Sequence, residues 1–473
     1  MNDPESLYLR MPTLLQHAFC SFWGWRIQRS RFGGIFPVLL REAESRTFWS
    51  IDRLRVYRDQ RLRAFIHHCA RTVPFYRRRF QEYGISPDDI NGLEDLKCLP
   101  ILTREEVQDF YSDLVSEAVP QQEKIIAHTS GTTGGGLRFA TTLRAVQEQW
   151  ATWWRYRRWH GLQMGTWCAY FGGRSVVPIT QDRPPFWRYN YPGKQILFSA
   201  YHMNPNSLSA YIDELRHRRP PWFHGYPSLL ALLATYILES GKDLGYQVRW
   251  VTVGAENLLK QQVDLMERAF GVRPKQHYGM AEAVANISEC EYGRLHVDED
   301  FAAVEFVPNP HSLGYKVIGT NFTNLATPLL RYDVKDVVTL SNDECPCGRQ
   351  GRVVESLDGR LEDYVILRNG TRIGRMDHIF KDLVNIREAQ IIQREPGVVI
   401  FRIVPRNNYS AADEVILRRE ATKRLGVDTE IIVEYVDRLP RSLTGKLRFV
   451  ESDLSQGRLK DVVVLKNDRE STR

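Results

Sequence analysis

Long apolar runs are missing from this 473-residue sequence. No segment reaches the roughly 18 consecutive apolar residues that a membrane-spanning helix requires. The first residues, MNDPE, also lack the basic start and the apolar core of a secretion signal. These absences predict a protein without a transmembrane segment that acts in the cytoplasm.

Cysteine and blocks of like charge are scarce as well. The seven cysteines have no regular spacing, which indicates reduced thiols and again a cytoplasmic protein. The formal charge is +7, but no lysine and arginine block is long enough to suggest a nucleic-acid partner. Short basic clusters at Arg155–Arg158 and Arg216–Arg219 are typical of solvated helix faces or helix ends.

The order of predicted elements indicates an α/β protein of two or three domains. Residues 1–120 are predicted to be mostly helical, and Thr103 is expected to cap one of the helices. Over residues 140–290 strands alternate with helices, which predicts a parallel or mixed sheet with helices on its faces. Residues 183–190 are expected to form a loop. A boundary follows residue 358, so we expect a core at 121–358 and a small α/β domain at 359–473.

A glycine-rich stretch, HTSGTTGGG, occupies residues 128–136. Apolar residues on both sides predict two short strands joined by this loop, and its backbone N–H groups and hydroxyls suit a polyphosphate. A surface hairpin without a ligand is the alternative. A Walker-type loop is excluded, because it needs a lysine and a following helix.

Two polar segments fall where strands of the predicted sheet end. Gly254-Ala255-Glu256 follows a strand at 248–253, and Tyr278-Gly279-Met280-Ala281-Glu282 follows a short strand at 274–277. Ligands of open α/β sheets bind beyond the carboxyl ends of the strands. Both segments are therefore candidate ligand-binding positions.

Five motifs that follow one another along the chain resemble the signature set of the adenylate-forming enzymes, which include acyl-CoA synthetases and peptide-synthetase adenylation domains. The N-terminal segments Thr72–Tyr76 and Leu99–Thr103 are similar to the phenylacetate–CoA ligase branch, and closest to its capsule-biosynthesis relatives. The resemblance covers nearly the whole chain and implies a large domain followed by a small mobile one. The motifs are Ser130–Gly134, Tyr278–Glu282, Tyr332–Asp336, Gly359–Asp363 and Thr444–Lys446.

The resemblance implies that these motifs bind ATP and Mg²⁺. The glycine loop would wrap the phosphates, Tyr278 would stack on adenine, Asp336 would bind the ribose, and Arg360 the ribose or a phosphate. Glu282 would help to hold Mg²⁺, whose preferred ligands are oxygens. The implied ATP-binding residues are Thr129, Ser130, Gly131, Thr132, Thr133, Gly134, Gly254, Ala255, Glu256, Tyr278, Gly279, Met280, Asp336 and Arg360.

Lys446 is the catalytic residue that the resemblance implies, together with Glu282. Its cation would offset the charge that develops when the acid attacks the α-phosphate. Glu362 stands at the hinge about which relatives rotate the small domain, where Asp or Lys is more usual. Gly134-Gly135-Gly136 departs from the family's Gly-x-Pro, which makes the loop looser.

A second group of residues offers three thiols and an imidazole: Cys290, His296, Cys345 and Cys347. This is the ligand set of a closed structural zinc site. On spacing alone, reduced cysteines in loops are slightly favoured over a metal site. The resemblance implies Zn²⁺, because branch members include examples with a metal at a corresponding cluster.

Three functions are compatible with these residues. The first is an acid–CoA ligase for an aromatic or other small acid, whose acyl pocket would lie near Trp222, His224 and Tyr226. The second keeps adenylation but transfers the acyl group to an amine or hydroxyl, for example on a sugar in surface-polysaccharide synthesis. The third is an inactive homologue that serves as a scaffold, which the joint presence of the motif residues argues against.

Overall fold

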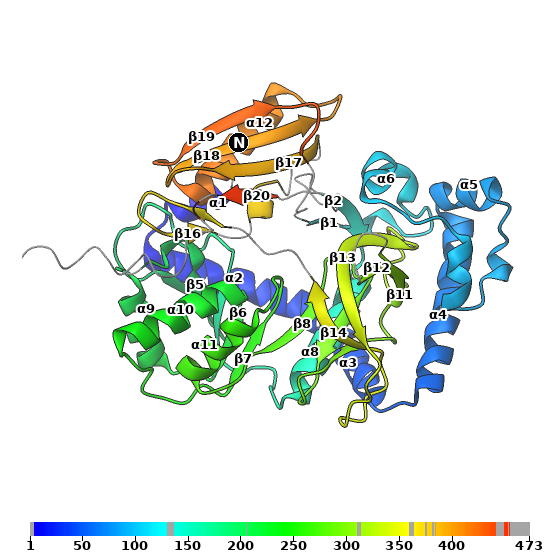
Figure 1. Cartoon of the computed structure of the whole chain (residues 1–473), viewed down its shortest axis with the longest axis horizontal. Helices are drawn as coiled ribbons and strands as arrows, with labels where there is room; N and C mark the ends of the chain where they lie inside the picture. The colour runs from blue at the N-terminus through cyan, green and yellow to red at the C-terminus, as the bar shows by residue number, and fades with distance from the viewer. Residues whose placement is uncertain are drawn as a thin grey trace, which may run out of the picture. The chain divides into compact units, whose positions relative to one another are not determined.

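The computed structural model describes residues 4–129, 137–204, 206–309, 314–358, 364–373, 376–380, 383, 385–440, 449–452 and 454. These residues divide into two compact units (Figure 1). The larger holds nearly all described residues up to 358, and the smaller holds those from 364 onward. None of the described helices combines the length and the apolar character that crossing a bilayer needs.

The N-terminal part of the larger unit is helical, as predicted. Its helices bury an apolar face that includes Leu62, Phe65 and Ile66 of α4, against Phe139 of the hairpin strand β2. Thr103 caps α6 through a capping box with Glu106, which confirms the predicted start. The helices are α1 (Pro4–Leu9), α2 (Thr13–Phe32), α3 (Phe36–Ser45), α4 (Ile51–Thr72), α5 (Pro74–Glu82), α6 (Arg104–Asp109) and α7 (Tyr111–Leu114).

A twelve-stranded mixed sheet forms the centre of the larger unit, with the order β11-β12-β13-β14-β10-β9-β8-β7-β6-β3-β5-β4. Strands β5, β3, β6, β7 and β8 are parallel, and all pairs from β8 to β11 are antiparallel. The strands are β3 (Cys168–Gly172), β4 (Trp187–Asn190), β5 (Gln195–Ser199), β6 (Trp222–Gly225), β7 (Trp250–Val253), β8 (Lys275–Gly279), β9 (Asn286–Glu289), β10 (Leu295–Val297), β11 (Ala303–Pro308), β12 (Tyr315–Thr320), β13 (Tyr332–Ser341) and β14 (Val353–Asp358).

Helices connect and cover the parallel strands. Val251 and Val253 of β7 are fully buried, as expected for a strand covered on both faces. Helix α3 packs against α8, and α10 packs against α11 beside β6 and β7 (Figure 1). These helices are α8 (Leu143–Trp159), α9 (Leu208–Arg218), α10 (Pro227–Ser240) and α11 (Lys260–Phe270).

The smaller unit has its own four-stranded sheet, with the order β19-β18-β17-β20 (Figure 1). Strands β17 and β18 are antiparallel, and β19 and β20 flank them in parallel. Its core includes Phe380, Phe401 and Leu417. The elements are the β15–β16 hairpin (Val365–Ile366 and Arg372–Ile373), β17 (Ile386–Gln393), β18 (Val398–Pro405), α12 (Ala411–Leu425), β19 (Glu430–Tyr435) and β20 (Val450–Ser452).

Two predictions of local structure were wrong. Residues 187–190 do not belong to a loop but form β4, the antiparallel edge strand beside β5. All four residues of β4 are buried, and a helix, α2, covers this edge. The basic cluster on α8 is not solvated, since Arg155 and Arg157 are both buried. The cluster at the end of α9 is largely exposed, as expected.

Candidate active site

The two predicted strand-end segments lie side by side. Strands β7 and β8 pair in parallel, so Gly254-Ala255-Glu256 and the residues after Gly279 follow neighbouring strands at the same edge. Ala255 adopts φ +68°, an unusual conformation for a residue with a side chain. The Glu256 carboxylate accepts a 3.0 Å hydrogen bond from the backbone N–H of Ser228, in the first turn of α10. This bond satisfies one of the free N–H groups at the helix start.

Tyr278 and Asp336 are in direct contact. The phenol of Tyr278, on β8, donates a 2.7 Å hydrogen bond to the carboxylate of Asp336, on β13. Burial and the carboxylates of Asp336 and Glu282 raise the pKa of Tyr278 well above its usual value. Tyr278 therefore remains protonated, and it holds the Asp336 carboxylate in one orientation.

Glu282 is buried beside these two residues. Its backbone carbonyl accepts a 2.7 Å hydrogen bond from the Asn321 side chain. Together with burial, its carboxylate raises the pKa of Tyr332. The carbonyl of Met280 accepts a 2.7 Å hydrogen bond from Gln149, so α8 fixes the start of this segment. A buried carboxylate at the edge where these strands end fits the oxygen chemistry of Mg²⁺.

Trp222 and His224 of the predicted acyl pocket lie on the face of the sheet that α8 covers. The indole N–H of Trp222 donates a 2.8 Å hydrogen bond to the Thr252 hydroxyl, and His224 Nδ1 lies 2.9 Å from the same oxygen. Burial and the nearby Arg157 cation lower the pKa of His224 to about 3. The His224 ring is thus neutral at working pH.

Trp153 of α8 reaches the ends of the same strands. Its ring centroid lies 5.3 Å from that of His277, and its indole N–H donates a 2.8 Å hydrogen bond to Asn286. Gly279 permits this approach, because a Cβ there would lie 3.1 Å from the Trp153 nitrogen. Trp153 belongs to none of the sequence motifs, so its contact with this edge was not predicted.

Tyr226 follows β6 at the start of α10. Its backbone N–H donates a 2.9 Å hydrogen bond to the Phe171 carbonyl. A Cβ at Gly173 would lie 3.1 Å from the Tyr226 hydroxyl. The phenol therefore lies over the segment that follows β3, while Trp222 and His224 lie on the face beneath α8.

Several predicted residues fall outside the described part of the chain. The strands beside the glycine loop are described: β1 (Ile125–Thr129) pairs antiparallel with β2 (Leu137–Thr141), which confirms the two predicted strands. Thr129 pairs with Leu137 at their ends. Outside the described residues lie Ser130, Gly131, Thr132, Thr133 and Gly134 of the loop, together with Arg360, Glu362 and Lys446.

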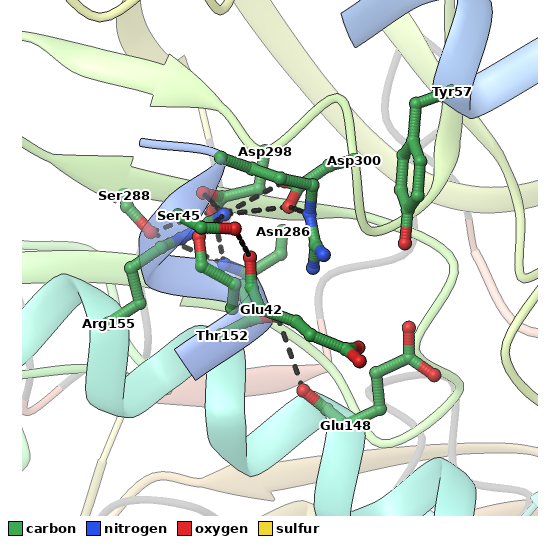
Figure 2. Close-up of polar contacts among 12 residues, drawn as sticks. Glu42, Ser45, Tyr57, Glu148, Thr152, Arg155, Asn286, Ser288, Asp298 and Asp300 are labelled. Atoms are coloured by element: carbon green, nitrogen blue, oxygen red, sulfur yellow. Dashed lines mark hydrogen bonds and ion pairs between the residues drawn. The ribbon is translucent and has the colours of Figure 1, made fainter. Parts of the chain in front are cut away.

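A buried ion-pair network fixes α8 to the sheet (Figure 2). The two terminal nitrogens of Arg155 each lie 2.7 Å from a carboxylate, one from Asp300 and one from Asp298. Asn286 and Ser288 of β9 also donate hydrogen bonds to Asp298. Because Asn286 also accepts from Trp153, the network extends to the end of β8.

The four candidate zinc ligands come together in space. Their ligand atoms all lie within 4.8 Å of one another. Cys290 Sγ lies 3.6 Å from Cys345 Sγ, and Cys347 Sγ lies 3.4 Å from His296 Nε2. The other imidazole nitrogen, Nδ1, lies 3.3 Å from the Gly351 carbonyl, which leaves Nε2 available as a ligand. The spacing suits tetrahedral zinc, with bonds of about 2.3 Å to sulfur and 2.0 Å to nitrogen.

Comparison with known proteins identifies relatives over most of the chain. Protein CapK of Staphylococcus aureus is 26% identical over 466 residues, which cover 95% of this chain and 99% of the relative. Phenylacetate-coenzyme A ligase of Thermus thermophilus is 25% identical over 460 residues, which cover 84% and 96%. The family model of the CapK C-terminal domain matches residues 365–453.

The fold also has solved counterparts. The structure of 2-hydroxyisobutyryl-CoA ligase in complex with 2-HIB-AMP and CoA superposes with a TM-score of 0.54 at 19% identity, covering 86% of this chain and 91% of that one. The same ligase in its postadenylation state gives a TM-score of 0.53. This chain is a homologue of protein CapK and of the phenylacetate–coenzyme A ligases, with the fold of the adenylate-forming CoA ligases.

Proposed function

We propose that this chain is an AMP-forming ligase that activates a small carboxylic acid. The acid's carboxylate attacks the α-phosphorus of ATP, the bond to the β-phosphate oxygen breaks, and an acyl-adenylate and pyrophosphate form. The thiol of CoA then attacks the acyl carbon. AMP leaves with the bonding electrons, the thiol proton passes to solvent, and an acyl-CoA remains.

The observation that carries this proposal is the Tyr278–Asp336 hydrogen bond at the edge where β7 and β8 end. It presents an aromatic ring and an oriented carboxylate together. An adenosine needs this pair of groups, since the ring can stack on adenine and the carboxylate can accept from both ribose hydroxyls. The full-length similarity to phenylacetate-coenzyme A ligase supports the same assignment.

Other residues supply charge to the reaction. Mg²⁺ bound near Glu282 would neutralise phosphate oxygens and make pyrophosphate a better leaving group. Lys446 would stabilise the charge that develops on the α-phosphate, and Arg360 would bind the ribose or a phosphate. We further propose that residues 359–473 act as a domain that reorients about Glu362 between the two stages.

Acid-dependent exchange of labelled pyrophosphate into ATP tests the adenylation step directly. A panel of aromatic and short aliphatic acids should include at least one that supports exchange, and Asp336→Ala should abolish it. If no acid supports exchange while the protein is folded, the adenylation proposal fails. The scaffold function would then account for the conserved fold.

The similarity to protein CapK favours a second candidate for the acceptor. The CapK family model matches residues 365–453, in the unit that follows the proposed hinge. Under this candidate the acyl group passes to an amine or hydroxyl, for example on a sugar in surface-polysaccharide synthesis. Competition between CoA and amino or hydroxyl acceptors for a preformed acyl-adenylate would distinguish the two. Faster AMP release with CoA supports the ligase.

We also propose that Cys290, His296, Cys345 and Cys347 bind a structural Zn²⁺. The support is the donor set itself and its compact spacing, with three sulfurs and one imidazole nitrogen within 4.8 Å. The ion would tie the β9–β10 turn to the loop before β14, segments 55 residues apart. Metal analysis of the purified protein should give one zinc per chain, and its absence would refute the proposal.

A further inference from the structure

Two arginines of α8 are equally buried but have opposite surroundings. Arg155 and Arg157 each expose 3% of their surface. Arg155 pairs with Asp298 and Asp300. The Arg157 side chain forms no ion pair and no hydrogen bond with the described residues, and its Nε is buried without a partner. The Nε of Arg155 also lacks a hydrogen-bond partner, so the difference between the two arginines is the counter-charge: Arg155 is paired with two carboxylates and Arg157 with none among the described residues.

Aromatic rings surround Arg157. Its guanidinium carbon lies 5.0 Å from the ring centroid of Trp154, 5.4 Å from that of Trp222 and 5.6 Å from that of Trp150. Burial lowers the pKa of Arg157 to about 10, so the group still carries its charge at neutral pH. Indole faces attract a cation but cannot accept its five N–H bonds. The guanidinium therefore retains unused donors in a mostly apolar setting.

A second arginine shares this setting. The guanidinium carbon of Arg31, on α2, lies 4.1 Å from the ring centroid of Trp150. Burial and the nearby cations of Arg174 and Arg157 lower the pKa of Arg31 to about 10. No carboxylate of the described residues pairs with Arg31 or Arg157. Two cations without a counterion repel each other, and an anion between or beside them would relieve that repulsion.

The Arg157 surroundings adjoin the proposed acyl pocket. Trp222 lies on β6 two residues before His224, on the same face of the sheet. The Arg157 cation contributes to the low pKa of both His224 and His277. His277 in turn lies beneath Gly254, where a Cβ would approach its ring to 3.1 Å. The Arg157 cation thus acts on side chains of β6 and β8 that lie close to the strand ends.

We propose that the acid activated by this enzyme carries a second anionic group, which the Arg157 guanidinium binds. The substrate class is a dicarboxylic acid or another acid with a distal anionic substituent. One carboxylate is adenylated at the strand ends, and the distal anion reaches the aromatic face around Trp222. The inference rests on the proposed adenylation, to which it adds the charge of the substrate.

Matched pairs of acids test this charge preference. Glutarate and terephthalate are compared with their own monoamides, which keep the shape and lose the distal charge. In pyrophosphate exchange the wild type should prefer the dianion by roughly 30-fold or more in kcat/KM, as for other buried charge pairs. Arg157→Met should reduce the ratio of kcat/KM for the dianion to kcat/KM for the monoamide to about one. Arg158→Met, which removes a neighbouring arginine paired with Glu44, should leave the preference unchanged.

The outcomes separate the two proposals. Equal exchange with dianions and monoamides overturns the inference and leaves the ligase function standing. No exchange with any acid refutes the ligase function, and binding then decides the inference: glutarate, without ATP, should raise the wild-type Tm more than its monoamide does. If Arg157→Met does not fold, Arg157→Gln takes its place and should lose the preference for the dianion in the same way.

Discussion

Tyr278 and Asp336 stand 58 residues apart in the sequence and are joined by a 2.7 Å hydrogen bond between β8 and β13. The bond spans the change from parallel to antiparallel strands, because β8 is the last parallel strand and β13 belongs to the antiparallel half. The proposed nucleotide contacts thus come from both halves of one sheet.

Removing the phenol hydroxyl tests this bond. In Tyr278→Phe, Asp336 loses a donor that orients it, while the aromatic face remains. We expect the KM for ATP to rise about 10-fold, equivalent to ~1.4 kcal/mol, with little change in the KM for the acid. Tyr292→Phe, at an exposed position, is the control. An unchanged KM for ATP in Tyr278→Phe would contradict the proposed ribose contact.

Lys446→Ala should separate the two half-reactions. Adenylation should slow by roughly 100-fold or more, the usual cost of removing a group that stabilises transition-state charge. Transfer from a preformed acyl-adenylate should change little, because that step breaks the bond to AMP without expelling pyrophosphate. Single-turnover assays of each half-reaction give the two rates. Equal losses in both steps would argue against a role confined to adenylation.

Asp300→Asn should destabilise the larger unit strongly. Burial alone would raise the pKa of Asp300, but Arg155 and Arg46 lower it well below its usual value. The substitution leaves these two buried arginines short of a counter-charge, at a cost of about 3–5 kcal/mol. Asp343→Asn, which disrupts an exposed pair with Arg294, should cost under about 1 kcal/mol. Urea unfolding followed by circular dichroism measures both.

Mild acid should destabilise the protein through its buried histidines. Burial lowers the pKa of His224 to about 3 and of His160 to about 4. In the unfolded chain these histidines have a pKa near 6.5, so below that pH the unfolded state binds protons that the folded state does not bind. The free energy of unfolding therefore falls as the pH drops below about 6.5. The free energy of unfolding continues to fall until the pH reaches the pKa values that the histidines have in the folded state. Tm measured from pH 7.5 to 4.5 should decline less steeply in His224→Gln than in the wild type.

Cys290→Ser should lower both zinc content and stability. Loss of one of four ligands weakens a structural zinc site and with it the fold that the ion supports. Cys98→Ser, at an exposed cysteine away from the cluster, should retain one zinc per chain and an unchanged Tm. A strong chelator should lower the Tm of the wild type and of Cys98→Ser alike. A Tm that resists the chelator in all three proteins would count against the metal.

The elements that the sequence predicted well depend on short-range rules. The Thr103 cap, the strands beside the glycine loop and the helix of α8 follow from turn chemistry and apolar spacing. The burial of Arg155 could not be predicted in this way, because its partners Asp298 and Asp300 come from more than 140 residues away. Local spacing predicts the helix but not which residues each of its faces contacts.

In the candidate site, too, local sequence predicted individual residues but not the contacts between them. The motif residues Tyr278 and Asp336 were identified in sequence, but only the folded chain places them in contact. Trp153 and Arg157 carried no motif at all, and their importance comes from proximity to His277 and Trp222. Long-range contacts of this kind depend on the sheet order, which no single segment encodes.

The change of strand direction between β8 and β9 also bears on how the protein assembles. Antiparallel neighbours such as β11 and β12 are joined by a short connection and can pair directly. The parallel strands β6 and β7 are joined through α10, so they can pair only after that longer segment has folded between them. We expect pulsed hydrogen exchange to show the antiparallel strands protected before the parallel ones. The proposed nucleotide contacts would then be completed only when the slower half docks, so we expect an incompletely folded chain not to consume ATP.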